Sequence, residues 1–127
     1  MSKLPPEWEC YAGLKFGEQD MNSPYEEPGP TRDEVNVWSG PAVLEFGADW
    51  CGYCQGAQPL IALALGSVPG VRHVKVADGK GKSLGRSFAV KLWPTLVFLK
   101  DGQEVARAVR PTDAEEVRRG LAATGVG

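Results

Sequence analysis

The feature that most constrains the fold is Cys51-Gly52-Tyr53-Cys54, two cysteines separated by two residues. The pair follows a brief apolar run, residues 42–46. A run of this length with Gly and Pro at its ends indicates a buried strand. From residue 51 to residue 65 the apolar positions suit a helix. The two thiols are therefore predicted at a strand-to-helix junction, within one helical turn of each other.

This position predicts different roles for the two thiols. Cys51 stands at the start of the helix, where unpaired backbone N–H groups and the positive end of the dipole favour a thiolate. Cys54 lies one turn deeper and is expected to be less exposed. The outer thiolate is predicted to attack a disulfide, and the inner thiol to resolve the mixed disulfide that forms.

A metal site is the alternative use of a cysteine pair. A structural zinc ion needs four ligands, and the chain adds only Cys10 and His73, in no ligand-like spacing. We therefore expect no metal, and no cofactor other than a redox-active Cys51–Cys54 disulfide. Cys10 is expected to pack as a small hydrophobe, and His73 to be a solvent-facing or hydrogen-bonded histidine without a catalytic role.

The turn and capping residues predict an α/β fold. Thr31 and Glu34 are spaced as a capping box, and so are Thr112 and Glu115 before the last helix. Asp101-Gly102 predicts a hairpin turn. The predicted order is helix 31–38, strand 42–46, helix 51–65, strand 71–76, helix 82–88, strands 95–99 and 104–109, and a final helix.

Composition excludes several classes of protein. A length of 127 residues with 43% hydrophobic and 24% charged residues is typical of one globular domain. Fourteen Lys and Arg against sixteen Asp and Glu give a net charge of −2, which predicts neither nucleic-acid nor membrane binding. The longest apolar stretch, 60–65, has six residues, against about 18 for a membrane span.

Residues 1–30 differ in composition from the rest. They hold five prolines and are predicted to form a partly packed extension, with a short strand or helical turn around 8–17, before a domain of residues 31–127. The first residues contain no apolar run of signal-peptide length, so we expect a cytoplasmic protein. Thiols there are mostly reduced, and a closely spaced pair is more often catalytic or metal-binding than structural.

Beyond the cysteine pair, the chain resembles the thioredoxin family over about residues 31–124. The resemblance implies a thioredoxin-like fold, a central mixed β-sheet flanked by helices with a C-terminal antiparallel hairpin. It rests on Phe46, Ala48 and Trp50-Cys51-Gly52-x-Cys54, on Pro59 as the proline that kinks the active-site helix, on Trp93-Pro94-Thr95 as the cis-proline loop, and on Phe98-Leu99-Lys100-Asp101-Gly102 as the final hairpin.

The resemblance implies a proton relay beside the inner cysteine. Glu45 stands where the family has a buried carboxylate, and Lys75 matches the lysine that pairs with it. Burial would raise the pKa of Glu45 toward neutrality, which suits an acid–base role. The alternative is a glutamate and a lysine that both reach solvent from an edge strand.

The resemblance also implies a substrate surface. Pro94 would be cis and would expose backbone groups of Trp93 and Thr95 to an extended substrate; the alternative is an ordinary trans proline that opens an edge strand. Trp50 and Trp93 would flank the sulfurs as an apolar platform, although either could be a core residue. The predicted substrate-binding residues are Trp50, Gly52, Tyr53, Trp93, Pro94 and Thr95.

Three positions depart from the family pattern. Gly47 replaces the usual aromatic residue two positions after the buried acid, Tyr53 replaces the proline between the cysteines, and Gln55 replaces a basic residue. The implied function is a monomeric thiol–disulfide oxidoreductase that reduces or exchanges protein disulfides and is recycled by a thioredoxin reductase or another dithiol reductant. The alternatives are a redox sensor whose residues 1–30 cover the site, and a non-enzymatic binding module.

Overall fold

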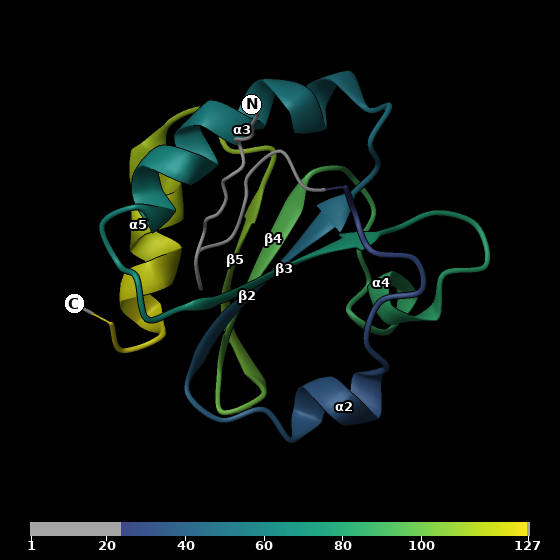
Figure 1. Ribbon diagram of the computed structural model, residues 1–127, viewed down its shortest axis with the longest axis horizontal. Helices are drawn as coiled ribbons and strands as arrows, with labels where there is room; N and C mark the ends of the chain where they lie inside the picture. Colours follow the sequence, from purple (N-terminus) through teal and green to yellow (C-terminus); the bar gives the residue numbers. More distant parts are fainter. Residues whose placement is uncertain (1–23, 127) are drawn as a thin grey trace, which may run out of the picture.

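The computed structural model describes residues 24–126, which are built around one four-stranded sheet of order β3-β2-β4-β5 (Figure 1). The central strand β2 (Pro41–Gly47) is parallel to β3 (Arg72–Ala77) and antiparallel to β4 (Thr95–Lys100). β5 (Gln103–Val109) completes an antiparallel hairpin with β4. The predicted mixed sheet with a C-terminal hairpin is confirmed.

Helices cover both faces of this sheet. α3 (Gly52–Leu65) and α5 (Ala114–Ala123) lie on one face, and the short helices α2 (Arg32–Asn36) and α4 (Ser83–Ser87) lie on the other (Figure 1). The eight elements within the described residues follow the predicted order. The strand or turn expected at 8–17 lies outside the described residues. Within residues 24–126, no helix is long and apolar enough to cross a membrane.

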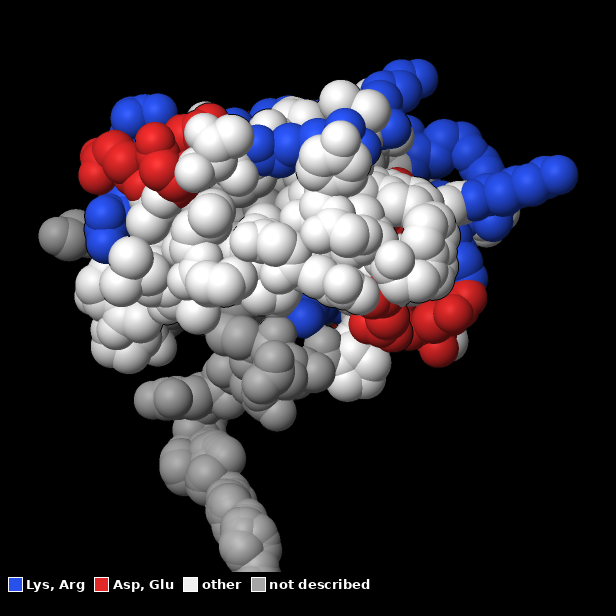
Figure 2. Space-filling view, turned by 90° about the horizontal axis from the view of Figure 1, so that it is seen from above, with Lys and Arg blue, Asp and Glu red and all other residues white. Residues whose placement is uncertain are grey.

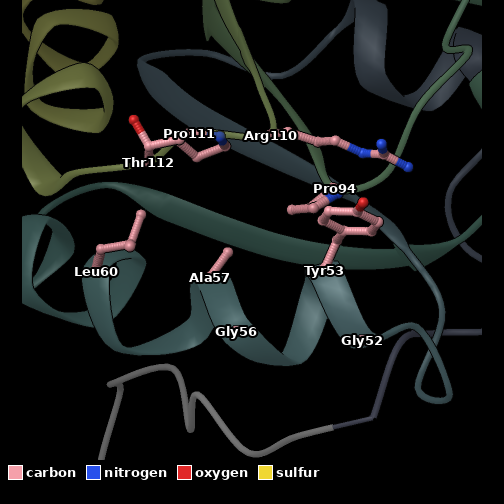
Figure 3. A pocket seen from close by; sticks show the side chains of 9 residues that line it. All are labelled: Gly52, Tyr53, Gly56, Ala57, Leu60, Pro94, Arg110, Pro111 and Thr112. Atoms are coloured by element: carbon pink, nitrogen blue, oxygen red, sulfur yellow. The ribbon is translucent and has the colours of Figure 1, made fainter.

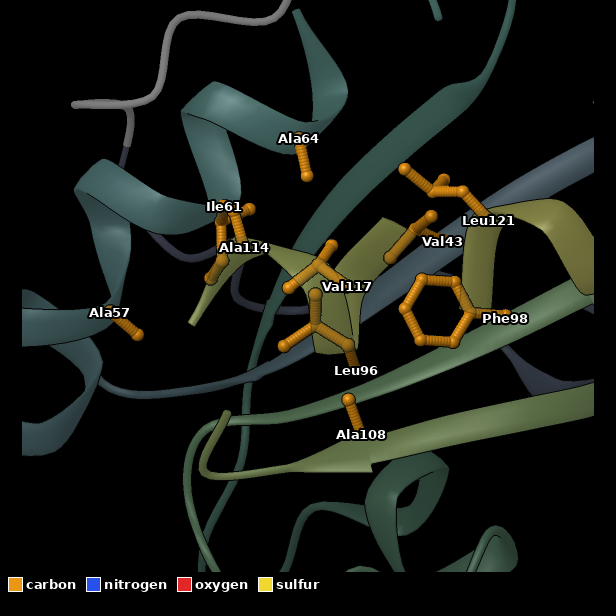
Figure 4. Packing of buried hydrophobic residues seen from close by; sticks show 10 residues of the cluster. All are labelled: Val43, Ala57, Ile61, Ala64, Leu96, Phe98, Ala108, Ala114, Val117 and Leu121. Carbon is orange, nitrogen blue, oxygen red and sulfur yellow. The ribbon is translucent and has the colours of Figure 1, made fainter. Parts of the chain in front are cut away.

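Strand β2 is buried on both faces, which explains why its sequence is a nearly continuous apolar run. Residues 42 and 44 face α2 and α4, and residue 43 faces α3 and α5. The cluster under α3 and α5 (Figure 4) comprises Val43, Ala57, Ile61, Ala64, Leu96, Phe98, Ala108, Ala114, Val117 and Leu121. A charged residue at position 45 therefore lies between two hydrophobic layers, next to the helix that carries the cysteines.

The two predicted capping boxes have different outcomes. At α2 the Thr31 hydroxyl accepts the Glu34 N–H and the Thr31 N–H donates to the Glu34 carboxylate, as predicted. At α5 the prediction is wrong by one residue, since Asp113 accepts the Glu116 N–H. A carboxylate at the helix N-terminus interacts more favourably with the positive end of the helix dipole than a hydroxyl does. Thr112 instead donates from its N–H and its hydroxyl to the Glu116 carboxylate.

Candidate active site

The two cysteines are free thiols at the start of α3. Cys51 is the N-cap residue, and its Sγ accepts the backbone N–H of Cys54 over 3.3 Å. Cys54 is the more buried of the two, 1% exposed against 6%. Burial and the hydrogen bond with Cys51 raise the pKa of Cys54 to about 12. At neutral pH Cys54 therefore keeps its proton and needs a base before it can attack.

Glu45 is fully buried, so the solvent-reaching alternative is wrong. Its Oε2 accepts from Tyr25 Oη at 2.6 Å and from Gln58 Nε2 at 2.8 Å, and its Oε1 lies 2.9 Å from His73 Nε2. Burial alone would raise the pKa of Glu45, but the hydrogen bond and electrostatic interaction with His73, and hydrogen bonds from Tyr25 and Gln58, lower it below its ordinary value. The predicted rise toward neutrality is therefore wrong, because three donors offset the cost of burying the charge.

Lys75 lies on β3 directly beside Glu45. It is 5% exposed, so it does not reach solvent. Its Nζ donates to Gln58 Oε1 over 3.2 Å, and Gln58 in turn donates to Glu45 and to the carbonyl of Cys54. Gln58, one turn of α3 beyond Cys54, therefore connects the carboxylate, the lysine and the inner cysteine.

His73 is part of this network and is not the solvent-facing residue that the sequence also allowed. It is 6% exposed, its Nε2 faces Glu45, and its Nδ1 is buried without a hydrogen-bond partner among residues 24–126. The alternation of His73 and Lys75 with Val74 and Val76 could have indicated that both polar side chains share one face of β3. Among the described residues, no three His, Cys, Asp or Glu side chains could hold a metal ion.

Tyr25 completes the network from the segment predicted as a partly packed extension, to which the sequence analysis gave no site residue. Its ring fills the space beside Gly47: a Cβ added at this glycine would lie 2.9 Å from Tyr25 Oη and 2.6 Å from Cys54 Sγ. The aromatic group missing at position 47 is thus supplied by a residue from before α2. Tyr25 packs with Ala48 and the two cysteines in one small cluster.

Trp93 packs against the cluster that holds the two cysteines, and Trp50 directly precedes Cys51 in the sequence. Trp50 is 76% exposed, and its ring meets that of Trp93 edge-on with centroids 5.6 Å apart. The Trp93–Pro94 peptide bond is cis, the isomer that the resemblance implies. Thr95 differs from the expectation, because its side chain is buried and its hydroxyl donates to the Leu92 carbonyl.

A groove of about 760 Å³ runs from Gly52 and Tyr53 along α3, bounded on its other side by Pro94 and residues 110–112 (Figure 3). Arg110, which the sequence analysis missed, closes one end: its guanidinium lies 3.9 Å from the centroid of the Tyr53 ring, and its Nε donates to the Trp93 carbonyl. That hydrogen bond occupies one of the backbone groups expected to meet substrate.

The face that carries α3 is mostly uncharged. No charged residue occurs between Trp50 and Val71, and Figure 2 shows a broad white area with Lys, Arg, Asp and Glu toward its rim. Exposed apolar side chains on this stretch include Trp50, Tyr53 and Leu63. Such a face suits contact with another protein better than contact with a charged small molecule.

Comparisons of the sequence with known proteins agree with a dithiol site at the start of α3. The family model described as Thioredoxin matches residues 31–123. Thioredoxin H-type 1 of Nicotiana tabacum is 39% identical over 67 residues, 53% of each chain, and thioredoxin of Chlamydia trachomatis is 30% identical over 65% of this chain and 80% of its own. The matched region therefore spans about half of the tobacco relative.

A solved structure extends the match. Thioredoxin 2 from Pseudomonas aeruginosa PAO1, in its reduced form, is 52% identical, with a TM-score of 0.73 over 81% of this chain and 96% of its own. A mutant thioredoxin from Halobacterium salinarum, 24% identical with a TM-score of 0.65 over 84% of this chain and 95% of its own, supports the fold alone. With the Cys51–Cys54 dithiol at the start of α3 and the family match over most of its length, this chain belongs to the thioredoxin family of thiol–disulfide oxidoreductases.

Proposed function

We propose that this chain reduces protein disulfides, with Cys51 as the attacking thiolate, Cys54 as the resolving thiol and Glu45 as the proton acceptor. The observation that carries the proposal is the contrast between the two sulfurs. Cys51 caps α3 and accepts a backbone N–H, whereas Cys54 is held protonated by burial, next to an ionised carboxylate network. Lys75 and Gln58 hold this network in place.

The proposed substrate surface consists of Trp50, Gly52, Tyr53 and the Trp93–Pro94 loop. Trp50 and Tyr53 offer exposed aromatic area, and Gly52 leaves the approach to Cys51 open, since nothing lies within 4 Å of a Cβ placed there. Aromatic residues of this kind carry much of the binding energy in protein interfaces. Thr95 is proposed to act through its backbone, because its side chain is buried.

The proposed partners are proteins with accessible disulfides and a thioredoxin reductase or another dithiol reductant that returns the Cys51–Cys54 disulfide to the dithiol. The proposed compartment is the cytoplasm, where the dithiol form is maintained. We further propose that the chain acts as a monomer. The division into an extension of residues 1–30 and a domain of residues 31–127 stays a prediction.

Trapping of mixed disulfides tests the roles of the two cysteines. The variant Cys54→Ser should accumulate covalent adducts with insulin through Cys51, while Cys51→Ser should form none. The unmodified chain should reduce insulin with NADPH and a thioredoxin reductase as the electron source. Peptide mapping identifies the linked cysteine, and adducts through Cys10 or Cys54 in the parent would contradict the assignment.

A further inference from the structure

Backbone hydrogen bonds fix Tyr25 and Glu26 against the site. Glu26 pairs with β3, its N–H donating to the Lys75 carbonyl and its carbonyl accepting the Ala77 N–H. One residue earlier, the Tyr25 N–H donates to the Asp49 carboxylate over 3.1 Å, just before the cysteines. Because these hydrogen bonds hold both residues, the Tyr25 side chain enters the interior at one defined place.

At this place the hydroxyl lies between the inner thiol and the carboxylate. Tyr25 Oη donates to Glu45 Oε2 over 2.6 Å, the shortest of the three hydrogen bonds on that carboxylate. The same hydroxyl and Cys54 Sγ converge on the point that a side chain at Gly47 would occupy. The hydroxyl also lies close enough to the Cys54 thiol to lower the pKa of that thiol, against the effect of burial.

Groups from three other elements surround Glu45. His73 from β3 takes Oε1, Gln58 from α3 shares Oε2 with Tyr25, and the neighbour on β4 is the apolar Leu96. Lys75 from β3 contacts Gln58 and the Tyr25 ring, with its Nζ 4.7 Å from the centroid of that ring.

We propose that Tyr25 relays the proton of Cys54 to Glu45 in the resolving step. The inference rests on the proposed roles of Cys54 and Glu45, and adds a residue from the N-terminal segment to them. Burial and the nearby carboxylate raise the pKa of Tyr25, so a tyrosinate is unfavourable here. The Tyr25 hydroxyl therefore receives the Cys54 proton at the same time as it passes its own proton to Glu45, and no tyrosinate accumulates.

Protons and electrons balance in this step. In the mixed disulfide, the Cys54 Sγ–H bond breaks, its proton passes to Tyr25 Oη, and the proton of Tyr25 passes to Glu45 Oε2. The electron pair left on Cys54 forms the bond to Cys51 Sγ, and the bond from Cys51 to the substrate sulfur breaks. That sulfur leaves as a thiolate, so the two cysteines have lost two electrons and the substrate disulfide has gained them.

The test separates the two thiol steps with Ellman's reagent, one equivalent per dithiol, in the full chain carrying Cys10→Ser. Attack by Cys51 releases the first thionitrobenzoate in a second-order phase, and resolution by Cys54 releases the second in a phase independent of concentration. Tyr25→Phe keeps the ring and removes only the hydroxyl. We expect it to slow the second phase at neutral pH by about tenfold or more and to leave the first phase unchanged.

The pH profile and a double variant distinguish a relay from a packing role. The difference in second-phase rate between Tyr25→Phe and the parent should shrink as pH rises, because Cys54 then ionises without a relay. Glu45→Gln should slow the second phase as well, and adding Tyr25→Phe to it should slow that phase no further. A parent-like second phase in Tyr25→Phe, equal slowing of both phases, or independent effects in the double variant would overturn the proposal.

A measurement on the unsubstituted active site covers the case in which Tyr25→Phe folds poorly. The rate of the second phase is measured in mixtures of H₂O and D₂O and plotted against the deuterium fraction of the solvent. If two protons are transferred in the rate-limiting step, the plot is curved, whereas transfer of one proton gives a straight line. A straight line contradicts the relay. If the parent shows no second phase at all, the proposed dithiol function fails; if it does and only the relay outcomes fail, that function stands.

Discussion

At Glu45, burial and hydrogen bonding act on one carboxylate in opposite directions, and the hydrogen bonds dominate. Because its pKa in the folded protein is below the ordinary 4.5, the ionised form contributes stability that is fully present above pH 4.5. That contribution is lost as pH falls through the folded pKa. The Glu45→Gln side chain does not titrate, so this variant lacks that pH-dependent contribution to stability.

The free energy of unfolding of Glu45→Gln should therefore lie below that of the parent at pH 7, and the gap should narrow as pH falls below 4.5. Denaturant unfolding at a series of pH values measures it. Glu115→Gln, on the exposed side of α5, is the control and should leave the profile of the parent nearly unchanged. A gap that stays constant into acid would show that Glu45 is not ionised in the folded protein.

At the residue scale, local sequence located the two cysteines and the buried acid, but not the groups that set the acid's charge. Glu45 was recognisable because it interrupts an apolar run. Its donors Tyr25, Gln58 and His73 come from three separate parts of the chain, 13 to 28 residues away. Tyr25 was out of reach because its segment has no strand or helix periodicity; only an isolated bridge pairs it with β3.

At the scale of elements, the start of α5 shows why capping predictions slip by one residue. The sequence Pro111-Thr112-Asp113 offers two adjacent capping residues, and Glu115 and Glu116 give each a partner three residues on. The pattern alone fits both alignments. The structure selects Asp113, whose carboxylate accepts the Glu116 N–H over 3.0 Å.

Asp113→Ala should therefore cost about 1 kcal/mol of stability, the usual loss on removing an N-cap. Thr112→Ala should cost less, since the Thr112 N–H still donates to Glu116 after the hydroxyl is gone. Denaturant unfolding of the two single variants checks the order. A larger loss for Thr112→Ala would restore the alignment that the sequence suggested.

At the scale of the whole molecule, one close approach sets how tightly α5 lies on the sheet. Gly120 of α5 faces Phe98 of β4, and an added Cβ would overlap the phenyl ring. Interiors are packed densely enough that such an overlap forces shifts in side chains or backbone. The layer order was predictable from the sequence, but this spacing was not, because it depends on two residues that are 22 positions apart.

Gly120→Ala should accordingly destabilise the protein by about 1–3 kcal/mol, although alanine is the better helix former. Gly56→Ala on α3 is the matched control: nothing lies within 4 Å of its Cβ, so the helix should gain up to about 1 kcal/mol. Thermal and denaturant unfolding report both. A stabilising Gly120→Ala would mean that α5 stands farther from the sheet than described.

The position of Tyr25 also bears on where this module ends. The match to the family begins at residue 31, so a chain excised at that boundary would retain both cysteines and Glu45 but lose the phenol that touches them. The cut would open a cavity over Gly47 at the centre of the redox site, in the space that the Tyr25 ring now fills. In this protein the residues that pack around the two cysteines therefore begin before the stretch that the family model matches.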